Sequence, residues 1–300
     1  MSNRLILTSR ERPTTSFPSQ RWWSEKTVAV VTGANKGIGF ALVKQLAEKG
    51  LTVVLTSRDI VRGREAVISL QKMNISVDYC QLDITDQASI SSFTAWLRRR
   101  FGGLDILVNN AGVSFNKIEE NNVDHAEIVI KTNFYGSKSL IEALLPLFRR
   151  SPSRSQIFNI SSQLGLPDKL RDPILKAELA DENKLTVNAI EEMLNRFLKN
   201  VKDGSLVEKR WPEIWPDYSV SKLALMLYSR LLAKTHQWDR VNVNCYCPGF
   251  TKTDMTHGVG SHTADEAAEV AVQYILTTPS ESFTGLFFKW STKVNLPSKI

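Results

Sequence analysis

The chain has 300 residues, of which 42% are hydrophobic and 23% charged, and its formal net charge is +7. This composition is that of a soluble globular protein, and the length allows one large domain or two small ones with a sizeable buried core. No run reaches the roughly 18 apolar residues of a membrane span, so we expect no membrane partner.

The positive charge is spread along the chain, whereas nucleic-acid binding requires a clustered basic face. The dense basic runs are residues 98–100 and 149–150. Both fall at predicted helix ends, where solvated cations complement the helix dipole. We therefore expect no nucleic-acid partner, and a modest basic excess that suits a phosphate-bearing cofactor.

Three cysteines, Cys80, Cys245 and Cys247, are too few and odd in number for a disulfide framework, which indicates a reducing compartment. The four histidines are scattered and match no metal-ligand spacing, so we expect no metal. We interpret residues 1–25, which are polar and begin with a stretch rich in Ser, Thr and Arg, as a flexible tail before a single domain, 26–300. A cytoplasmic location follows, with a plastid as the alternative if the tail is a transit peptide.

The first expected strand, residues 27–31, runs directly into a loop that contains Gly33, Gly37 and Gly39, and a helix pattern follows up to Gly50. Strand, glycine turn and helix is the context in which glycines let the backbone approach a pyrophosphate at a helix N-terminus. The sequence therefore predicts a dinucleotide site here.

The second expected strand, residues 51–56, is followed by Ser57 and Arg58 where an acid would bind the ribose 2′-hydroxyl of NAD. Arg58 suits a 2′-phosphate instead, and Lys36 in the glycine loop adds a second cation. Asp59 comes one position late and is interpreted as a helix N-cap. These residues favour NADP(H) over NAD(H).

Helices and strands continue to alternate along the chain. We expect helices at 59–72, 86–101, 123–150, 186–204, 218–232 and 265–277, and strands at 75–82, 104–108, 156–160, 241–247 and 284–288. This order predicts an α/β fold with a doubly wound parallel sheet, the Rossmann fold. The strandless residues of about 163–215 are too few for their own core and are interpreted as a helical insertion.

Two polar features stand out on the expected helices. Tyr218 and Lys222 are four residues apart and so share one face, where an ammonium would favour the phenolate and lower the pKa of the phenol. Such a phenol can exchange a proton with a carbonyl or an alcohol. Asn133 is unfavourable in a helix interior, and the simplest explanation is a solvent-facing side chain.

Together these motifs resemble, in order, the set of the short-chain dehydrogenase/reductases: the glycine loop, Asn109-Asn110-Ala111-Gly112, Asn133, Ser162, Tyr218-x-x-x-Lys222 and Pro248-Gly249. The match runs from about residue 27 to 288. The long segment before Tyr218 resembles the carbonyl reductase branch, including the plant menthone, neomenthol and salutaridine reductases. In that branch the extra helix covers the dimerisation surface, so the resemblance implies a monomer.

The resemblance also implies roles for single residues. Tyr218 is the expected general acid, and Lys222 lowers its pKa and holds the nicotinamide ribose. Ser162, with Ser161 as the alternative, hydrogen-bonds the substrate carbonyl, and Asn133 anchors a water chain to Lys222. The expected cofactor-binding residues are Gly33, Asn35, Lys36, Gly37, Ile38, Gly39, Arg58 (2′-phosphate), Asp83 (adenine), Asn110 (ribose), Ala111, Gly112, Tyr218, Lys222, Pro248, Gly249, Thr251 (near the carboxamide) and Thr253.

The implied activity is NADPH-dependent reduction of a small apolar ketone or aldehyde. Two alternatives remain at this point: an NADP-dependent alcohol dehydrogenase working in the oxidative direction, and a non-catalytic NADP(H)-binding redox sensor or scaffold. Cys247 lies beside Pro248-Gly249. We expect it to be a buried inert thiol rather than a redox-sensitive one.

Overall fold

Eight strands form a single sheet in the computed structural model, which describes residues 21–115, 122–149, 154–181, 183–235, 240–280 and 282–294. The strand order is β3-β2-β1-β4-β5-β6-β7-β8, and only β8 runs antiparallel to its neighbour. The strands are β1 (Val28–Val31), β2 (Thr52–Ser57), β3 (Asp78–Gln81), β4 (Ile106–Asn109), β5 (Ser155–Ile160), β6 (Val241–Cys247), β7 (Phe287–Lys289) and β8 (Thr292–Val294). The expected doubly wound sheet is confirmed.

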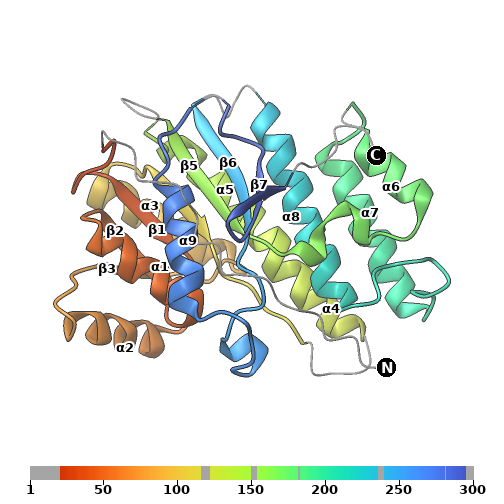
Figure 1. Cartoon of the computed structure of the whole chain (residues 1–300), viewed down its shortest axis with the longest axis horizontal. Coiled ribbons are helices and arrows are strands. Elements are labelled where there is room, and N and C mark those ends of the chain that lie inside the picture. The colour runs from red at the N-terminus through yellow and green to blue at the C-terminus, as the bar shows by residue number, and fades with distance from the viewer. Residues whose placement is uncertain are drawn as a thin grey trace, which may run out of the picture.

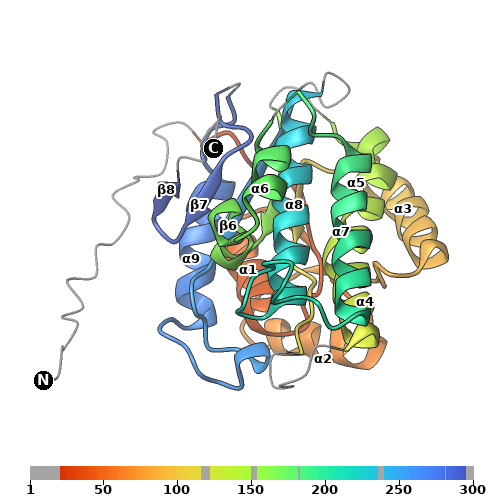
Figure 2. The ribbon, with the colours of Figure 1, turned by 90° about the vertical axis from the view of Figure 1, so that its right-hand side faces the viewer.

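Helices cover both faces of this sheet. One face carries α1 (Gly37–Glu48), α2 (Ile60–Gln71) and α9 (Ala264–Ile275); the other carries α3 (Gln87–Phe101), α4 (Val123–Ile130), α5 (Ser137–Leu144) and α8 (Pro216–Lys234). The expected insertion contains α6 (Pro173–Ala180) and α7 (Val187–Lys202). α7 packs on the outer side of α4 and α8, which separate it from the sheet (Figure 1). Figure 2 shows α8, α7, α5 and α3 from their outer side.

Alternation along the central strands divides the core in two. On β1, Val28 and Val30 join the cluster under α3, α5 and α8, while Ala29 and Val31 join the cluster under α1 and α9. Since every β1 side chain is buried, the strand reads as a continuous apolar run rather than an alternating one.

The winding reverses at β1, because β2 lies on one side of it and β4 on the other. In open α/β sheets ligands bind in the crevice that this reversal opens at the carboxyl ends of the strands. The glycine loop after β1 and the Asn110 turn after β4 both lie there, so the topology itself predicts where the site is.

Several element boundaries differ from the sequence expectation. The helix expected over 123–150 is interrupted by a π-helical turn, Lys131–Gly136, and ends in a 3₁₀ turn, Leu145–Leu147. The last helix begins after an N-cap at Thr263, whose hydroxyl accepts the Glu266 amide, rather than at Asp265. α6 and β8 were not expected, β7 begins later than 284, and β3 is shorter than 75–82.

The tail boundary at residue 25 is wrong. Trp23 is 7% exposed and belongs to the core under α1. Its indole nitrogen donates to the Lys49 carbonyl (3.2 Å), and that of Trp22 donates to the Leu276 carbonyl (3.0 Å). The chain therefore packs on the domain from residue 21 onward, and residues 1–20 of the expected tail lie outside the described residues.

Arg149 is not a solvated helix-end cation. It pairs with Asp105 at 2.9 Å and donates to the carbonyls of Lys26 and Phe101, both at 2.7 Å. Arg149 thus ties the start of β1 to the loop before β4. None of the described helices is both long and apolar enough to cross a membrane.

Candidate active site

The glycine loop is held by close backbone contacts with the turn after β4. Gly33 has φ of +60°, and a Cβ there would lie 2.9 Å from the Ala111 Cα. A Cβ on Gly39 would lie 2.4 Å from the side-chain nitrogen Nδ2 of Asn110 and 2.8 Å from the Gly33 carbonyl oxygen. The Thr32 hydroxyl accepts the backbone N–H groups of Asn110 and Ala111, both at 3.0 Å. Only glycine fits these positions.

The N-terminus of α1 faces the space beside this loop. Its N-cap, Lys36, makes no side-chain hydrogen bond to the first turn. The first amides of the helix and its dipole are therefore available to an anion, and the absent Cβ atoms of the glycines make room for one. These residues fit the pyrophosphate of a dinucleotide.

The side chain of Asn110 holds the glycine loop in place, and its expected ribose contact stays a prediction. Its amide nitrogen donates to the carbonyls of Thr32 (2.9 Å) and Gly33 (3.1 Å), so it locks the glycine loop. Asp83 likewise accepts the amide and hydroxyl of Thr85, at 2.9 and 2.7 Å, which shapes the turn after β3. Both residues still border the cavity described below.

Cations gather after the end of β2, where the sequence predicts a site for a 2′-phosphate. Arg58 is exposed directly after β2, and Arg62, one helical turn further, borders the same cavity. Asp59 is the N-cap of α2, and its carboxylate accepts the Arg62 amide at 2.9 Å. The carboxylate nearest the end of β2 is thus engaged in capping, as expected.

Lys36 is paired across the mouth of the site. Its ammonium lies 2.7 Å from the carboxylate of Asp254, in the segment after β6. The Lys36 ammonium holds the pKa of Asp254 below its usual range. Sequence analysis did not assign Asp254 or Arg62; the four-residue spacing from Arg58 to Arg62 was the available signal for Arg62, and Asp254 had none.

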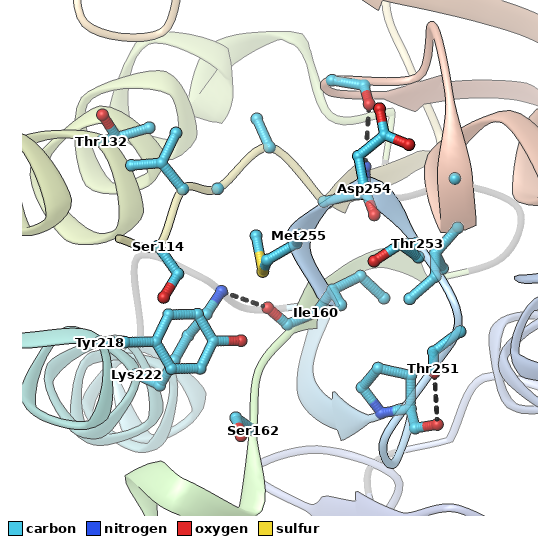
Figure 3. A pocket seen from close by; sticks show the side chains of 18 of the residues that line it. Ser114, Thr132, Ile160, Ser162, Tyr218, Lys222, Thr251, Thr253, Asp254 and Met255 are labelled. Carbon is cyan, nitrogen blue, oxygen red and sulfur yellow. Dashed lines mark hydrogen bonds between the residues drawn. The ribbon is translucent and has the colours of Figure 1, made fainter. Parts of the chain in front are cut away.

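Tyr218, Lys222 and Ser162 come together at the other end of the cavity (Figure 3). The Lys222 ammonium lies 5.5 Å from the centre of the Tyr218 ring and donates to the Ile160 carbonyl at 2.9 Å. Ser162 is the N-cap of a 3₁₀ turn, so its hydroxyl accepts the Leu164 amide at 3.2 Å. Ser161 instead donates to the Lys222 carbonyl at 3.5 Å, which favours Ser162 as the reactive serine.

The pKa of Tyr218 is shifted upward, against the sequence expectation. Burial raises it first, the neighbouring Cys247 adds to the rise, and a hydrogen bond from Ser162 offsets part of it. Burial lowers the pKa of Lys222 to about 8. With its pKa shifted upward, the phenol of Tyr218 is protonated at neutral pH.

Asn133 is fully buried, so the solvent-facing explanation is wrong. It lies in the π-helical turn, where its side chain accepts the Val113 amide (2.8 Å) and donates to the Val113 carbonyl and the Ser221 hydroxyl (both 3.0 Å). Asn133 thus links the segment after Gly112 to α8, at Ser221, the residue before Lys222. The water chain to Lys222 stays a prediction.

The cavity that joins the two ends has a volume of about 580 Å³. Every expected site residue borders it except Gly39 and Asn133, which hold the wall from behind. Thr251 is 3% exposed, with its hydroxyl on the Pro248 carbonyl at 3.0 Å, and Thr253 lies against Gly37. No cluster of metal-ligating side chains occurs among the described residues.

Apolar side chains line the catalytic end: Leu164, Ile214, Trp215, Phe250 and Met255. Three of them belong to the segment before Tyr218. Phe250 and Met255 follow the Pro248-Gly249 turn, and no pattern in the sequence marked them. Ile214 and Phe250 are 61% and 45% exposed, so they form the rim.

Trp215 forms the step into the catalytic helix. It is the N-cap of α8 with φ 45° and ψ 64°, a left-handed conformation, and its ring meets the Tyr218 ring edge-on at 6.3 Å. The neighbouring Cys247 is 2% exposed and also borders the cavity. Burial raises the pKa of its thiol, which agrees with the expected inert cysteine.

Comparison with known proteins agrees with this geometry. The family described as short chain dehydrogenase matches residues 27–170 and 185–264. The (+)-neomenthol dehydrogenase of Arabidopsis thaliana is 40% identical over 283 residues, covering 87% of this chain and 95% of the relative. Carbonyl reductase 3 of Mus musculus, named as NADPH-dependent, is 39% identical over 262 residues, covering 84% and 91%.

Among solved structures, salutaridine reductase from Papaver somniferum has a TM-score of 0.80 at 36% identity, covering 88% of this chain and 99% of that one. The sequence match, the sheet and the Tyr218–Lys222–Ser162 site agree on one assignment. This chain is an oxidoreductase of the short-chain dehydrogenase/reductase family, in its carbonyl reductase branch.

Proposed function

We propose that this protein reduces the carbonyl group of a small, largely apolar ketone or aldehyde to an alcohol with NADPH. The observation that carries the proposal is that one cavity is bordered by both the cofactor-binding and the catalytic residues. A phosphate-binding loop with three nearby cations borders one end, and a protonated tyrosine with apolar walls borders the other. The names of the relatives, a neomenthol dehydrogenase and an NADPH-dependent carbonyl reductase, support the same reaction.

The cofactor assignment follows from charge. Arg58, Arg62 and Lys36 would hold the 2′-phosphate, and the α1 amides would hold the pyrophosphate. Lys222 and Thr251 would hold the nicotinamide end. NADPH supplies the hydride when it is bound there. Asp59 comes one residue after Arg58, and one of its carboxylate oxygens caps α2, which favours a 2′-phosphate over a ribose 2′-hydroxyl as the group bound here.

The proton comes from Tyr218. Its raised pKa keeps the phenol protonated at neutral pH, as a general acid in the reducing direction requires. Ser162 donates to the carbonyl oxygen beside it, and the two hydroxyls stabilise the negative charge that develops there. The Lys222 ammonium favours the phenolate once the proton has left. This state of Tyr218 favours reduction over the oxidative alternative.

The first test is NADPH oxidation by the purified protein on menthone-like ring ketones and medium-chain alkenals. Tyr218→Phe keeps the ring but loses the acid, so we expect a loss of about 10²- to 10⁴-fold in kcat. NADPH binding measured by fluorescence should stay near the wild-type value. Full turnover by the variant would contradict the acid assignment. Tight NADPH binding without turnover of any carbonyl by the wild type would favour the non-catalytic reading.

We further infer that the protein is a monomer. α7 buries its apolar side chains Ile190, Met193, Leu194 and Phe197 against the domain's own core. A helix that already covers α4 and α8 leaves those two helices unavailable to a second copy. Light scattering on the purified protein tests this inference, and a stable dimer would contradict it.

A further inference from the structure

One buried hydroxyl at the catalytic end has no protein partner. Four buried side-chain polar atoms lack a hydrogen bond among the described residues: Ser114 Oγ, His125 Nδ1, Gln156 Oε1 and Ser205 Oγ. Only Ser114 borders the cavity. A buried hydroxyl without a hydrogen-bond partner lowers the stability of the fold. Such a hydroxyl on the wall of a ligand site is explained if a bound ligand supplies the missing partner.

Ser114 is held firmly on both sides. The preceding residue, Val113, exchanges two hydrogen bonds with the buried Asn133, at 2.8 and 3.0 Å. The following residue, Phe115, stacks on His125 with ring centres 4.3 Å apart. Because both neighbours are anchored, the Ser114 backbone is fixed, and only rotation about its own Cα–Cβ bond changes the direction of the hydroxyl.

The fixed backbone places Ser114 on the cavity wall near the reacting groups, where rotation about that bond can turn the hydroxyl toward a bound ligand. A Cβ on Gly112, two residues earlier, would lie 3.6 Å from the Lys222 ammonium. Figure 3 shows Ser114 beside Tyr218 and Lys222, with its hydroxyl oxygen toward the Tyr218 ring. Apolar side chains also line this cavity, among them Leu164, Trp215 and Met255.

We propose that Ser114 is a specificity-determining residue that hydrogen-bonds a second oxygen atom of the substrate. The chemical class it selects is a ketone or aldehyde that carries a hydroxyl or a further carbonyl close to the reduced one. In an apolar pocket, a site built for such a group rejects the analogue that lacks it, because the protein's polar atom is then left unpaired. This inference rests on the proposed carbonyl reduction.

The experiment compares matched substrates: camphorquinone against camphor, and 2-hydroxycyclohexanone against 2-methylcyclohexanone. The readout is the ratio of kcat/KM within each pair, so that the intrinsic reactivity of each ketone cancels between variants. We expect Ser114→Ala to lower the ratio about tenfold in at least one pair. Ser205→Ala, which removes a buried unpaired hydroxyl away from the cavity, should keep the wild-type ratio.

Thermal melting separates misfolding from lost recognition, because deleting an unpaired buried hydroxyl should not lower Tm. Ser114→Gly gives a second deletion if the alanine is poorly accommodated. Unchanged ratios in both pairs for both Ser114 variants would overturn the inference while leaving carbonyl reduction intact. A wild-type enzyme that reduces alkenals but none of the four ketones would also overturn the inference. One that turns over no ketone and no alkenal would overturn the proposed function as well.

Discussion

The two ends of the cavity are built by different means. At the cofactor end, the part beside the N-terminus of α1 is made by backbone: Gly33 and Gly39 lie against the Asn110 turn with no room for a Cβ. At the substrate end, side chains make it, and Ile214 and Phe250 are partly exposed to solvent. A site made of backbone tolerates no change of residue, whereas a site made of exposed side chains can change its shape and keep the fold.

The insertion supports this difference. It is anchored by residues that do not border the cavity: Phe197 packs edge-on against Trp211 with ring centres 5.1 Å apart. The Trp211 indole donates to the buried Asn200 at 3.0 Å. The segment from Trp211 to Tyr218 is thus anchored at Trp211, while Ile214 and Trp215 line the cavity. Variation at the rim would alter substrate choice without loosening the domain.

The sharpest test of the backbone-built end is Gly39→Val. A Cβ at this position would meet the Asn110 side-chain nitrogen at 2.4 Å and the Gly33 carbonyl at 2.8 Å, so the loop must shift. We expect NADPH affinity to fall by at least about 100-fold, since the pyrophosphate loses its fitted contacts. Titration of NADPH fluorescence measures it. Gly102→Val, at a helix end away from the cavity with nothing within 4 Å, controls for replacing a glycine by valine and should bind NADPH normally, although its φ of +73° adds a strain that Gly39 lacks.

Charge at the end of β2 should matter next. Arg58→Glu places a carboxylate where the 2′-phosphate would bind, so we expect the preference for NADPH over NADH to fall by about 10- to 100-fold. The ratio of kcat/KM for the two cofactors measures it. Arg64→Glu makes the same charge change on the following helix, α2, at an exposed position away from the cavity. An equal effect of both variants would show that overall charge, not the site, sets the preference.

The junction of the two ends should respond to pH through Lys222. Burial lowers the pKa of this ammonium to about 8, below its usual 10.5, so the group is charged below pH 8 and neutral above it. Only the charged form both donates to a ribose hydroxyl and favours the phenolate. We expect kcat/KM for NADPH, which reports the free enzyme, to fall about tenfold per pH unit above pH 8.

The same shift has an opposite sign for stability. Between pH 8 and 10.5 the unfolded chain holds a proton on Lys222 that the folded chain has released. The contribution of this group to the free energy of unfolding therefore rises with pH over that window. Chemical denaturation of the wild type and Lys222→Met at pH 7 and 9.5 isolates this contribution. The free energy of unfolding of the wild type, relative to that of the variant, should be higher at pH 9.5 than at pH 7. A kcat/KM profile that stays flat to pH 10 would contradict the assignment.

Sequence reasoning succeeded where local geometry decides. Gly33 could be predicted because its left-handed φ and close contact demand glycine, and Asp59 because an N-cap needs only its own helix. It failed where distant packing decides. The pair Tyr218 and Lys222 indicated a lowered phenol pKa, yet burial, which depends on the whole fold, reverses the sign. Asn133 was noticed, but its partners Val113 and Ser221 depend on a π-helical turn that no local pattern marks.

Trp215 offers the smallest and most discriminating test of the side-chain-built end. Its left-handed backbone precedes Pro216, and a proline disfavours helical and favours extended conformations in the residue before it. Trp215→Ala and Trp215→Gly both remove the ring beside Tyr218, but only glycine relieves the conformation. We expect the glycine variant to be more stable than the alanine variant by about 1 kcal/mol in urea denaturation, with similarly relaxed substrate selectivity. Equal stabilities would mean that the conformation carries no strain. The tryptophan would then be explained by its contact with Tyr218 alone, and the rim would be free to vary in backbone as well as in side chain.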